Sequence, residues 1–260
     1  MRLLRLFAAI FSISLRRGLA HRANLLFEAL VSVTAVAAGL GALGIVYTRT
    51  DTLGGWGLGE AVVLLGTYEI VSGVLWAFIE PNVAWFRDHV NDGRLDDTLL
   101  KPVSSIFLAT LGTCAPLGLL QVTMGMAIVS IGLWELGSVP TPWGILGWLL
   151  TLAMGIAITW ASRVLLASLA FWAPSFQPEV LYKALWQFGR YPVSVYRQPI
   201  RFALTYVLPM AFIATVPAQA LTRGPSPLLL IVGLAVGLGA ILVVQLVWNV
   251  GLRRYTSATS

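Results

Sequence analysis

Long apolar runs separated by short polar breaks organise the chain. Five of them are clear and lie at residues 25–47, 58–79, 106–134, 143–172 and 228–250. An α-helix needs roughly 20 residues to cross a hydrocarbon core of about 30 Å, and each run is long enough to do so. The pattern predicts an all-α integral membrane protein in which residues 1–260 form a single transmembrane domain.

Between the fourth run and the last, the chain is neither clearly apolar nor clearly polar. Residues 180–201 hold four basic residues, and residues 202–221 are apolar but interrupted by Pro209 and Pro217. Irregular backbone at membrane depth is tolerated only where it is buried in protein or lines a wet cavity. We therefore expect a short fifth span that turns into an external re-entrant hairpin at residues 197–223. The alternative keeps the four basic residues in the cytoplasm and makes residues 202–221 the fifth span.

Basic residues at the two ends predict the orientation. Five arginines precede the first span and two follow the last. We therefore expect a plasma-membrane protein with six spans and both termini in the cytoplasm. Residues 1–22 bring Arg2, Arg5 and Arg16 to one helical face, while apolar side chains cover much of the rest. This segment is expected to be an interfacial helix in contact with membrane lipid.

Residues 80–102 form a charged island between two apolar runs. They carry eight of the 28 charged residues, of which 17 are Lys or Arg and 11 are Asp or Glu, so the island must lie in water. Residues 83–90 are predicted to form a short amphipathic helix, residues 91–93 a turn, and residues 96–100 a second short helix stopped by Pro102. Because this is more structure than a linker needs, we expect a cytoplasmic docking element.

Composition excludes several classes of protein. The chain is 58% hydrophobic and 11% charged, with a mean hydropathy of +0.83, which is too apolar for a soluble domain of this size. The net charge is +6, but the basic residues lie mostly at the ends of apolar runs. They form no continuous stripe that could follow a nucleic-acid phosphate backbone, so no nucleic-acid partner is expected. The lone Cys114 lies in an apolar run and is expected to pack in the core.

No motif for catalysis or for a cofactor is present. The two lysines, Lys101 and Lys183, follow Leu and Tyr, so the chain has no phosphate-binding Gly-Lys-Ser/Thr. His21, His89 and Cys114 have no metal-ligand spacing, and no Gly-x-Ser-x-Gly occurs. We expect no enzyme activity, no metal site and no cofactor in this chain.

Ionisable residues inside the predicted spans mark a candidate substrate path. A charge at the bilayer centre costs about 2.5–3.5 kcal/mol on insertion scales, so it usually marks a pathway or a pairing inside the bundle. Glu69 in the second span is either a site for a cationic or hydrogen-bonding substrate or, as we favour, a structural partner of Arg163 or of a hydroxyl in a neighbouring span. Trp76 belongs to an aromatic set suited either to a cavity for flat apolar molecules or to the membrane interface.

Glycines in the first and last runs permit close helix contacts. Gly233 and Gly237 have the small-xxx-small spacing of packed transmembrane helices. The sequence leaves open whether they serve packing within the chain or a dimer seam.

Short motifs in a fixed order resemble the permease subunit of type-2 ABC transporters, in the branch of small six-span export permeases. The resemblance covers nearly the whole chain and rests on these pieces: Gly93-Arg94-Leu95, Leu99-Leu100-Lys101-Pro102-Val103, Arg190-Tyr191-Pro192, Leu208-Pro209, Pro217-Ala218, Trp248 and Gly251-Leu252-Arg253-Arg254-Tyr255. The family tail usually continues Tyr-x-Ser-Ala-Gly, whereas Thr259 stands here in place of the glycine.

The resemblance implies an assembly in which this chain is the permease. Residues 83–90 match the coupling helix, which would insert into a groove on a separate dimer of ABC ATPase subunits that holds ATP and Mg²⁺. The coupling residues are Val83, Trp85, Phe86, Arg87, Asp88, His89 and Val90. A second permease chain, identical or homologous, would complete the pore, and export of drug-like or natural-product cargo follows from the family alone. The alternative is a secondary transporter or channel without an ATPase, but no inverted repeat supports it.

Overall fold

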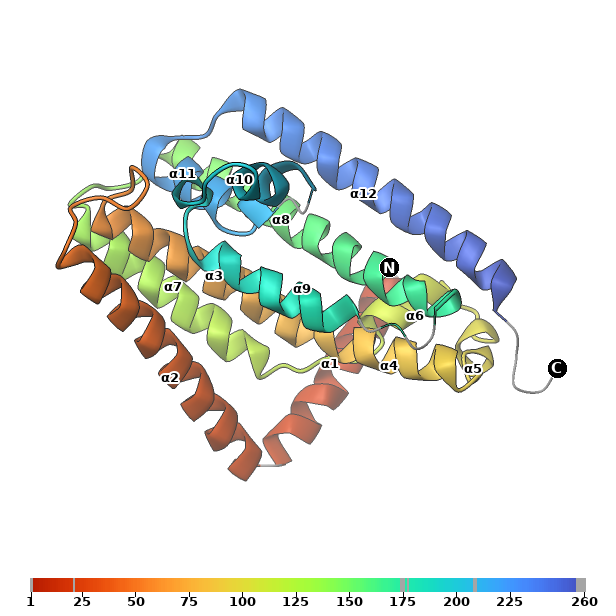
Figure 1. The fold of residues 1–260 in the computed structure, drawn as a ribbon. Helices are drawn as coiled ribbons and strands as arrows, with labels where there is room; N and C mark the ends of the chain where they lie inside the picture. The colour runs from red at the N-terminus through yellow and green to blue at the C-terminus, as the bar shows by residue number, and fades with distance from the viewer. Residues whose placement is uncertain (1, 21, 174–175, 177, 208–209, 256–260) are drawn as a thin grey trace.

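The computed structural model describes residues 2–20, 22–173, 176, 178–207 and 210–255, and these residues form helices and turns with no β-strand (Figure 1). Five of the described helices are long and apolar enough to cross a membrane. They are α2 (Arg22–Tyr47), α3 (Leu58–Phe78), α7 (Gly118–Glu135), α8 (Pro142–Ser168) and α12 (Pro227–Arg254). The prediction of an all-α integral membrane protein is thereby confirmed. A sixth helix that meets the same criteria of length and apolarity is not found among the described residues.

Shorter helices connect and flank these five. They are α1 (Arg2–Ala20), α4 (Glu80–Asn91), α5 (Asp96–Leu99), α6 (Ser105–Leu111), the 3-10 turn η1 (Leu169–Phe171), α9 (Pro178–Trp186), the 3-10 turns η2 (Gln187–Arg190) and η3 (Val193–Val195), α10 (Ile200–Phe202), the π-turn η4 (Ala203–Val207), the 3-10 turn η5 (Met210–Phe212) and α11 (Thr215–Arg223). The docking element, residues 80–102, holds α4, a turn with Gly93 at φ +67° and α5, as the sequence predicts.

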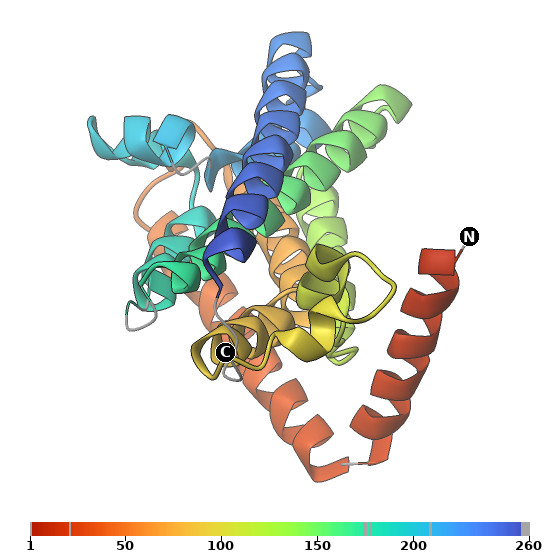
Figure 2. The same ribbon diagram turned by 90° about the vertical axis from the view of Figure 1, so that its right-hand side faces the viewer.

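Helix α3 lies at the centre of the bundle and is the most buried of the five. Helices α7 and α8 pack on it, α12 packs on α8, and α2 stands at the edge, where it meets α1 in a V (Figures 1 and 2). The sequence leaves open whether Gly233 serves packing within the chain or a dimer seam. In the structure Gly233 packs within the chain, because a Cβ there would come within 2.6 Å of the Phe212 ring.

A ladder of glycines brings α3 and α7 into backbone contact. Glycines recur every seven residues on both helices, at positions 59, 66 and 73 on α3 and at 118, 125 and 132 on α7. A Cβ atom at Gly66 would lie 2.7 Å from the carbonyl oxygen of Gly125, and one at Gly73 would lie 2.8 Å from that of Gly118. Small residues allow such close approach without a void. This contact fixes the core on which the other helices are arranged.

The third span is shorter than expected. The continuous helix predicted over residues 106–134 is wrong, because α6 ends at Leu111 and α7 begins only at Gly118. Between them, the Asn82 side chain accepts a hydrogen bond from the Thr113 amide at 2.8 Å and donates one to its carbonyl at 2.7 Å. Pro116 has no N–H to continue a helix. The break therefore anchors α4 to the chain before α7, and Cys114 within it is buried, as expected.

The bundle has two distinct ends. Helix α4 marks one of them, called here the α4 end, and the loops before α3 and α8 mark the opposite end. Both ends of the described chain lie at the α4 end, because Phe7 of α1 packs on Phe78 at 5.7 Å between ring centroids and the Tyr255 hydroxyl accepts from the Leu95 amide at 2.9 Å. Helix α8 ends there, whereas α12 starts at the opposite end beside Gly147. The chain must therefore pass between the two ends within residues 172–226.

Residues 178–194 make that passage along α3. Trp186 Nε1 donates to Ser72 Oγ at 3.1 Å, Arg190 lies 3.5 Å from Glu69, and Ser194 Oγ donates to the Gly54 carbonyl at 2.7 Å. These contacts step from one end of α3 to the other. Helix α9 has only nine residues before it tightens into η2, so the expected short fifth span is an interrupted helix.

The alternative fifth span over residues 202–221 is wrong as a continuous helix. The described part of that stretch breaks into short pieces, with turn residues at 213 and 214 before α11. Ser194, before α10, and Arg223, at the end of α11, both contact the loop before α3. The motif Leu208-Pro209 and the tail at residues 256–260 lie outside the described residues.

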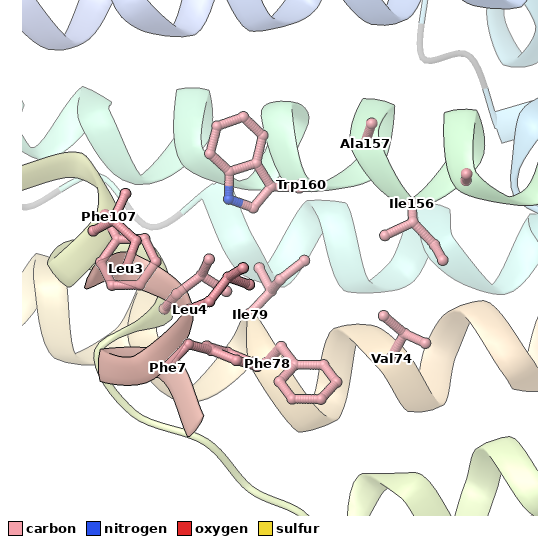
Figure 3. A pocket seen from close by; sticks show the side chains of 12 residues that line it. Leu3, Leu4, Phe7, Val74, Phe78, Ile79, Phe107, Ile156, Ala157 and Trp160 are labelled. Carbon is pink, nitrogen blue, oxygen red and sulfur yellow. The ribbon is translucent and has the colours of Figure 1, made fainter. Parts of the chain in front are cut away.

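An apolar cavity of 520 Å³ separates α1 from the rest of the α4 end (Figure 3). Leu3, Leu4 and Phe7 of α1 face Phe78 and Trp160 across it. Helix α1 thus presents its apolar face to the bundle, and its exposed Arg5 and Arg16 lie on the remaining surface. Helix α1 is thus amphipathic, and its place at the membrane interface stays a prediction.

Candidate functional site

A polar cavity of 280 Å³ lies between α3, α8 and the segment of α9 and η2. Several spans contribute to its lining: Tyr68, Ser72 and Trp76 from α3, Gln121 from α7, Arg163 from α8, and Lys183, Trp186 and Arg190 from the α9–η2 segment. Two of the three predicted path residues, Trp76 and Arg163, line it directly. The third, Glu69, lies behind the wall and contacts the cavity through its partners.

Glu69 is fully enclosed. Its side chain is 2% exposed, Gln121 Nε2 donates to its Oε2 at 2.6 Å, and the Arg190 guanidinium lies 3.5 Å from its Oε1. The Arg190 guanidinium also stacks over the Tyr68 ring at 5.3 Å from the centroid. The expected pairing of Glu69 with Arg163 is therefore wrong, because Arg190 and Gln121 take that place.

Arg163 pairs with Glu80 instead. The two side chains are 6% and 21% exposed and share a hydrogen-bonded ion pair. The Arg163 guanidinium lies 4.5 Å from the centre of the Tyr182 ring. Glu80 is the first residue of α4, so a carboxylate of the docking element reaches directly into the cavity wall. A buried pair of this kind is strongly destabilising to break, because one charge is left without its counter-ion.

The inner face of α4 holds the docking element on the bundle. Val83 and Phe86 are buried, and the Phe86 ring lies 4.9 Å from that of Trp248 and 5.5 Å from that of Phe171. These two predicted coupling residues therefore face the core of the bundle rather than the surface. Phe171 and Trp248 fix the orientation of α4 relative to α8 and α12.

The other predicted coupling residues lie at the edge of this contact or outside it, with Trp85 and Val90 partly buried against the core. Trp85 and His89 stack with ring centroids 4.0 Å apart, and Asp88 is 64% exposed. Arg87 and Val90 are half-buried beside them. Beyond the turn, Leu100 is 84% exposed next to exposed Asp97 and Lys101. The surface of the docking element beyond the turn thus combines exposed Leu99 and Leu100 with charged side chains.

A third ion pair lies at the opposite end. Arg223 of α11 donates through Nε and a terminal nitrogen to the two carboxylate oxygens of Glu60, at 2.7 and 2.6 Å, and to the Gly55 carbonyl at 2.7 Å. Its guanidinium lies 4.8 Å from the Trp56 ring centre. The hydrogen bonds to Glu60 raise the pKa of the Arg223 guanidinium above its ordinary value. Arg223 therefore stays charged and ties α11 to α3.

Replacing Arg223 with glutamine is expected to lower the free energy of unfolding by about 1–2 kcal/mol, because a bidentate charged hydrogen bond is lost at a partly exposed site. Thermal unfolding of the detergent-purified chain, followed by tryptophan fluorescence, measures the effect. Arg49→Gln is the matched control, since Arg49 is exposed in the same loop region and makes no ion pair in the described chain. Equal melting temperatures for the two variants would contradict the role of Arg223.

Several site residues are absent from the sequence prediction. Glu80, Gln121 and Arg190 complete the cavity network, and their distance along the chain from their partners hides the pairing. The seven-residue repeat of Gly59, Gly66 and Gly73 with its counterpart on α7 was a readable signal for the contact between α3 and α7. The sequence offers no comparable signal for the Glu60–Arg223 pair.

Comparison with known proteins assigns the chain to a family. Residues 33–259 match the family model described as an ABC-2 family transporter protein. No curated protein and no solved structure matches the chain. The match spans all five membrane-crossing helices except the start of α2, together with the docking element and the ion pairs Glu60–Arg223, Glu69–Arg190 and Glu80–Arg163. The chain therefore belongs to the ABC-2 family of transporter proteins and is an integral membrane permease.

Proposed function

We propose that this chain is the permease subunit of an ATP-driven ABC exporter in the plasma membrane, with its α4 end in the cytoplasm. A separate dimer of ABC ATPase subunits supplies ATP hydrolysis and holds ATP and Mg²⁺. The observation that carries the proposal is the docking element, which is anchored by a buried inner face and presents a charged outer face with an exposed leucine.

The docking element is suited to transmit motion. Its inner face packs on Phe171 of η1 and Trp248 of α12, and Glu80 at its start pairs with Arg163 of α8 in the cavity wall. An ATPase that moves α4 would therefore move both the helix contacts and the cavity charge together. Rigid-body movement of packed elements about an interface is a common way of switching access.

Topology supports the cytoplasmic placement of the α4 end. With residues 178–194 counted as an interrupted fifth crossing, the chain crosses six times and both termini share a side. That side carries Arg5, Arg16 and Arg17 before the first span and Arg253 and Arg254 after the last. The positive-inside rule assigns it to the cytoplasm, and the re-entrant segment around α11 then lies outside.

A second permease chain completes the path in this proposal. The polar cavity is partly open at the side of the bundle, and a single chain does not enclose it. In the most apolar stretches of α2 and α12, only 11% and 17% of the residues are buried. Lipid and a second chain therefore share this exposed apolar surface. The second chain is identical or homologous.

Leu100→Asp is expected to reduce ATPase co-purification at least tenfold, because a desolvated anchor residue at an interface is worth about 2 kcal/mol or more. The measurement is the amount of ATP-binding subunit recovered with the affinity-purified chain from native membranes. Val139→Asp is the matched control, since Val139 is 93% exposed in the loop at the opposite end. Undiminished recovery with Leu100→Asp would place the ATPase contact elsewhere, and no ATPase with the unaltered chain would favour a secondary transporter or channel.

A further inference from the structure

We infer that the polar cavity between α3, α8 and the α9–η2 segment binds an amphipathic anion, a molecule with a flat apolar body and one acidic group. The inference rests on the transport function proposed above and names the class of cargo for that path. It follows from which charges of the cavity are already paired and which are left over.

The carboxylates of the cavity are occupied. Glu69 is enclosed and holds Gln121 and Arg190, and Glu80 is taken by Arg163. Glu69 Oε1 accepts no hydrogen bond among the described residues, but it is enclosed behind the cavity wall and faces the Arg190 guanidinium at 3.5 Å. Each carboxylate therefore already has an arginine beside it as counter-charge. A cation entering here would also meet the positive charges of Arg163 and Arg190. The cavity therefore disfavours the cationic substrate that Glu69 alone suggests.

Cationic groups are in excess. Three basic side chains line the cavity, Arg163, Lys183 and Arg190, against the two carboxylates of Glu69 and Glu80. The excess charge lies on Lys183, which is exposed and makes no ion pair in the described chain. An unmatched ammonium group beside a membrane-embedded cavity attracts anions, because field lines are concentrated where the surroundings have a low dielectric constant.

Arg190 has hydrogen-bonding capacity left over. Its contact with Glu69 is long, at 3.5 Å, and its Nε–H has no acceptor among the described residues. Lys183 and Arg190 lie seven residues apart on one helical segment, about 11 Å along the axis, and both line the cavity. An acidic group held by Lys183 at the mouth can thus share the positive field of Arg190 farther in.

Aromatic surfaces suit the apolar part of the ligand. Trp186 lies between Tyr68 and Tyr182, with ring centroids 5.8 and 6.1 Å away, and its indole N–H is held by Ser72. Trp76 stands across the cavity with 51% of its surface exposed. Flat aromatic walls favour a planar ring system. A volume of 280 Å³ within one chain holds a small ring body, with the rest of the ligand reaching towards the second chain.

Equilibrium dye binding tests the inference. The full chain is purified into nanodiscs of zwitterionic phosphatidylcholine, and fluorescence anisotropy gives dissociation constants for two naphthalene dyes, one bearing a sulfonate and the other a trimethylammonium group. The sulfonate is expected to bind at least tenfold more tightly. Lys183→Gln is expected to weaken sulfonate binding about tenfold, since a charged hydrogen bond is lost, and Lys183→Glu to reverse the preference.

Lys101→Gln is the control, because Lys101 is the only other lysine and lies exposed in the docking element. Equal affinity for the two dyes, or unchanged affinities in Lys183→Glu, would overturn the inference. A second set of nanodiscs contains phosphatidylglycerol. If this lipid competes with the sulfonate in the unaltered chain but not in Lys183→Gln, the anion comes from a lipid headgroup. Without competition, the anion is a soluble molecule.

Failure of the inference is distinguishable from failure of the proposed function. Dye binding requires no ATPase and no ATP, whereas the exporter proposal depends on ATPase recovery. If the cavity selects anions but no ATPase is recovered with the chain, the anion site is supported and the ABC exporter proposal is contradicted. If an ATPase is recovered but the cavity binds both dyes equally, the exporter proposal is supported and the anion site is contradicted.

Discussion

Replacing Gly125 with leucine is expected to leave little folded protein. A Cβ atom at this position would lie 2.7 Å from the Gly66 carbonyl oxygen and 2.8 Å from the Ile70 amide nitrogen. Both are backbone atoms of α3, so no side chain can swing aside and the two helices must separate. Overpacking in a core typically costs about 1–3 kcal/mol, and here the separation also removes the contacts of Gly59 and Gly73.

The fraction of detergent-purified chain that elutes as a single symmetrical peak in gel filtration measures this effect. Gly239→Leu is the matched control, because a Cβ at Gly239 of α12 meets no atom within 4 Å. We expect Gly239→Leu to behave like the unaltered chain and Gly125→Ala to fall between the two. A monodisperse and fully stable Gly125→Leu variant would mean that α3 and α7 are not in backbone contact.

Glu80→Gln is expected to destabilise the chain by about 3 kcal/mol, because the buried Arg163 guanidinium loses the counter-charge of Glu80. We further expect Glu80→Gln chains that assemble with the ATPase to support ATP hydrolysis but to transport little cargo, because the link between the docking element and the cavity is weakened. Thermal unfolding measures the first effect, and the ratio of transport to ATP hydrolysis measures the second.

Charge exchange makes this prediction specific to the pair. The double variant Glu80→Arg with Arg163→Glu is expected to recover part of the lost stability, whereas each single change does not. Glu135→Gln is the control, because Glu135 is exposed at the opposite end and makes no ion pair in the described chain. If Glu80→Gln and Glu135→Gln have the same stability and the same coupling ratio, the pair does not link docking element and cavity.

The sequence predicts the long helices and the docking element well, for physical reasons. Membrane spans are recognisable by length and apolarity, and a charged island between two spans has to lie in water. It does not reveal the break before α7, because residues 112–117 are themselves apolar or small. The break depends on Pro116 and on the Asn82 side chain, which bonds to Thr113 from 31 residues away.

The candidate site is less predictable than the fold. Amphipathicity shows that one face of residues 83–90 is apolar, but it does not show whether the bundle or a partner covers that face. Phe86 turns out to pack on Trp248, which lies 162 positions later. In the same way, the cost of burying a charged Glu69 predicts that it has a polar or charged partner but does not predict which residue that is. Arg163 and Arg190 are equally basic, and only the path of residues 178–194 along α3 selects Arg190.

The energy source of transport tests the central claim most directly. The matched naphthalene dyes are added outside inside-out membrane vesicles with and without this chain. Dye uptake into the lumen is followed with ATP, with a non-hydrolysable ATP analogue, and with a proton ionophore. The exporter account predicts chain-dependent movement that requires hydrolysable ATP and persists with the ionophore. Chain-dependent movement that proceeds without ATP and collapses with the ionophore would contradict it.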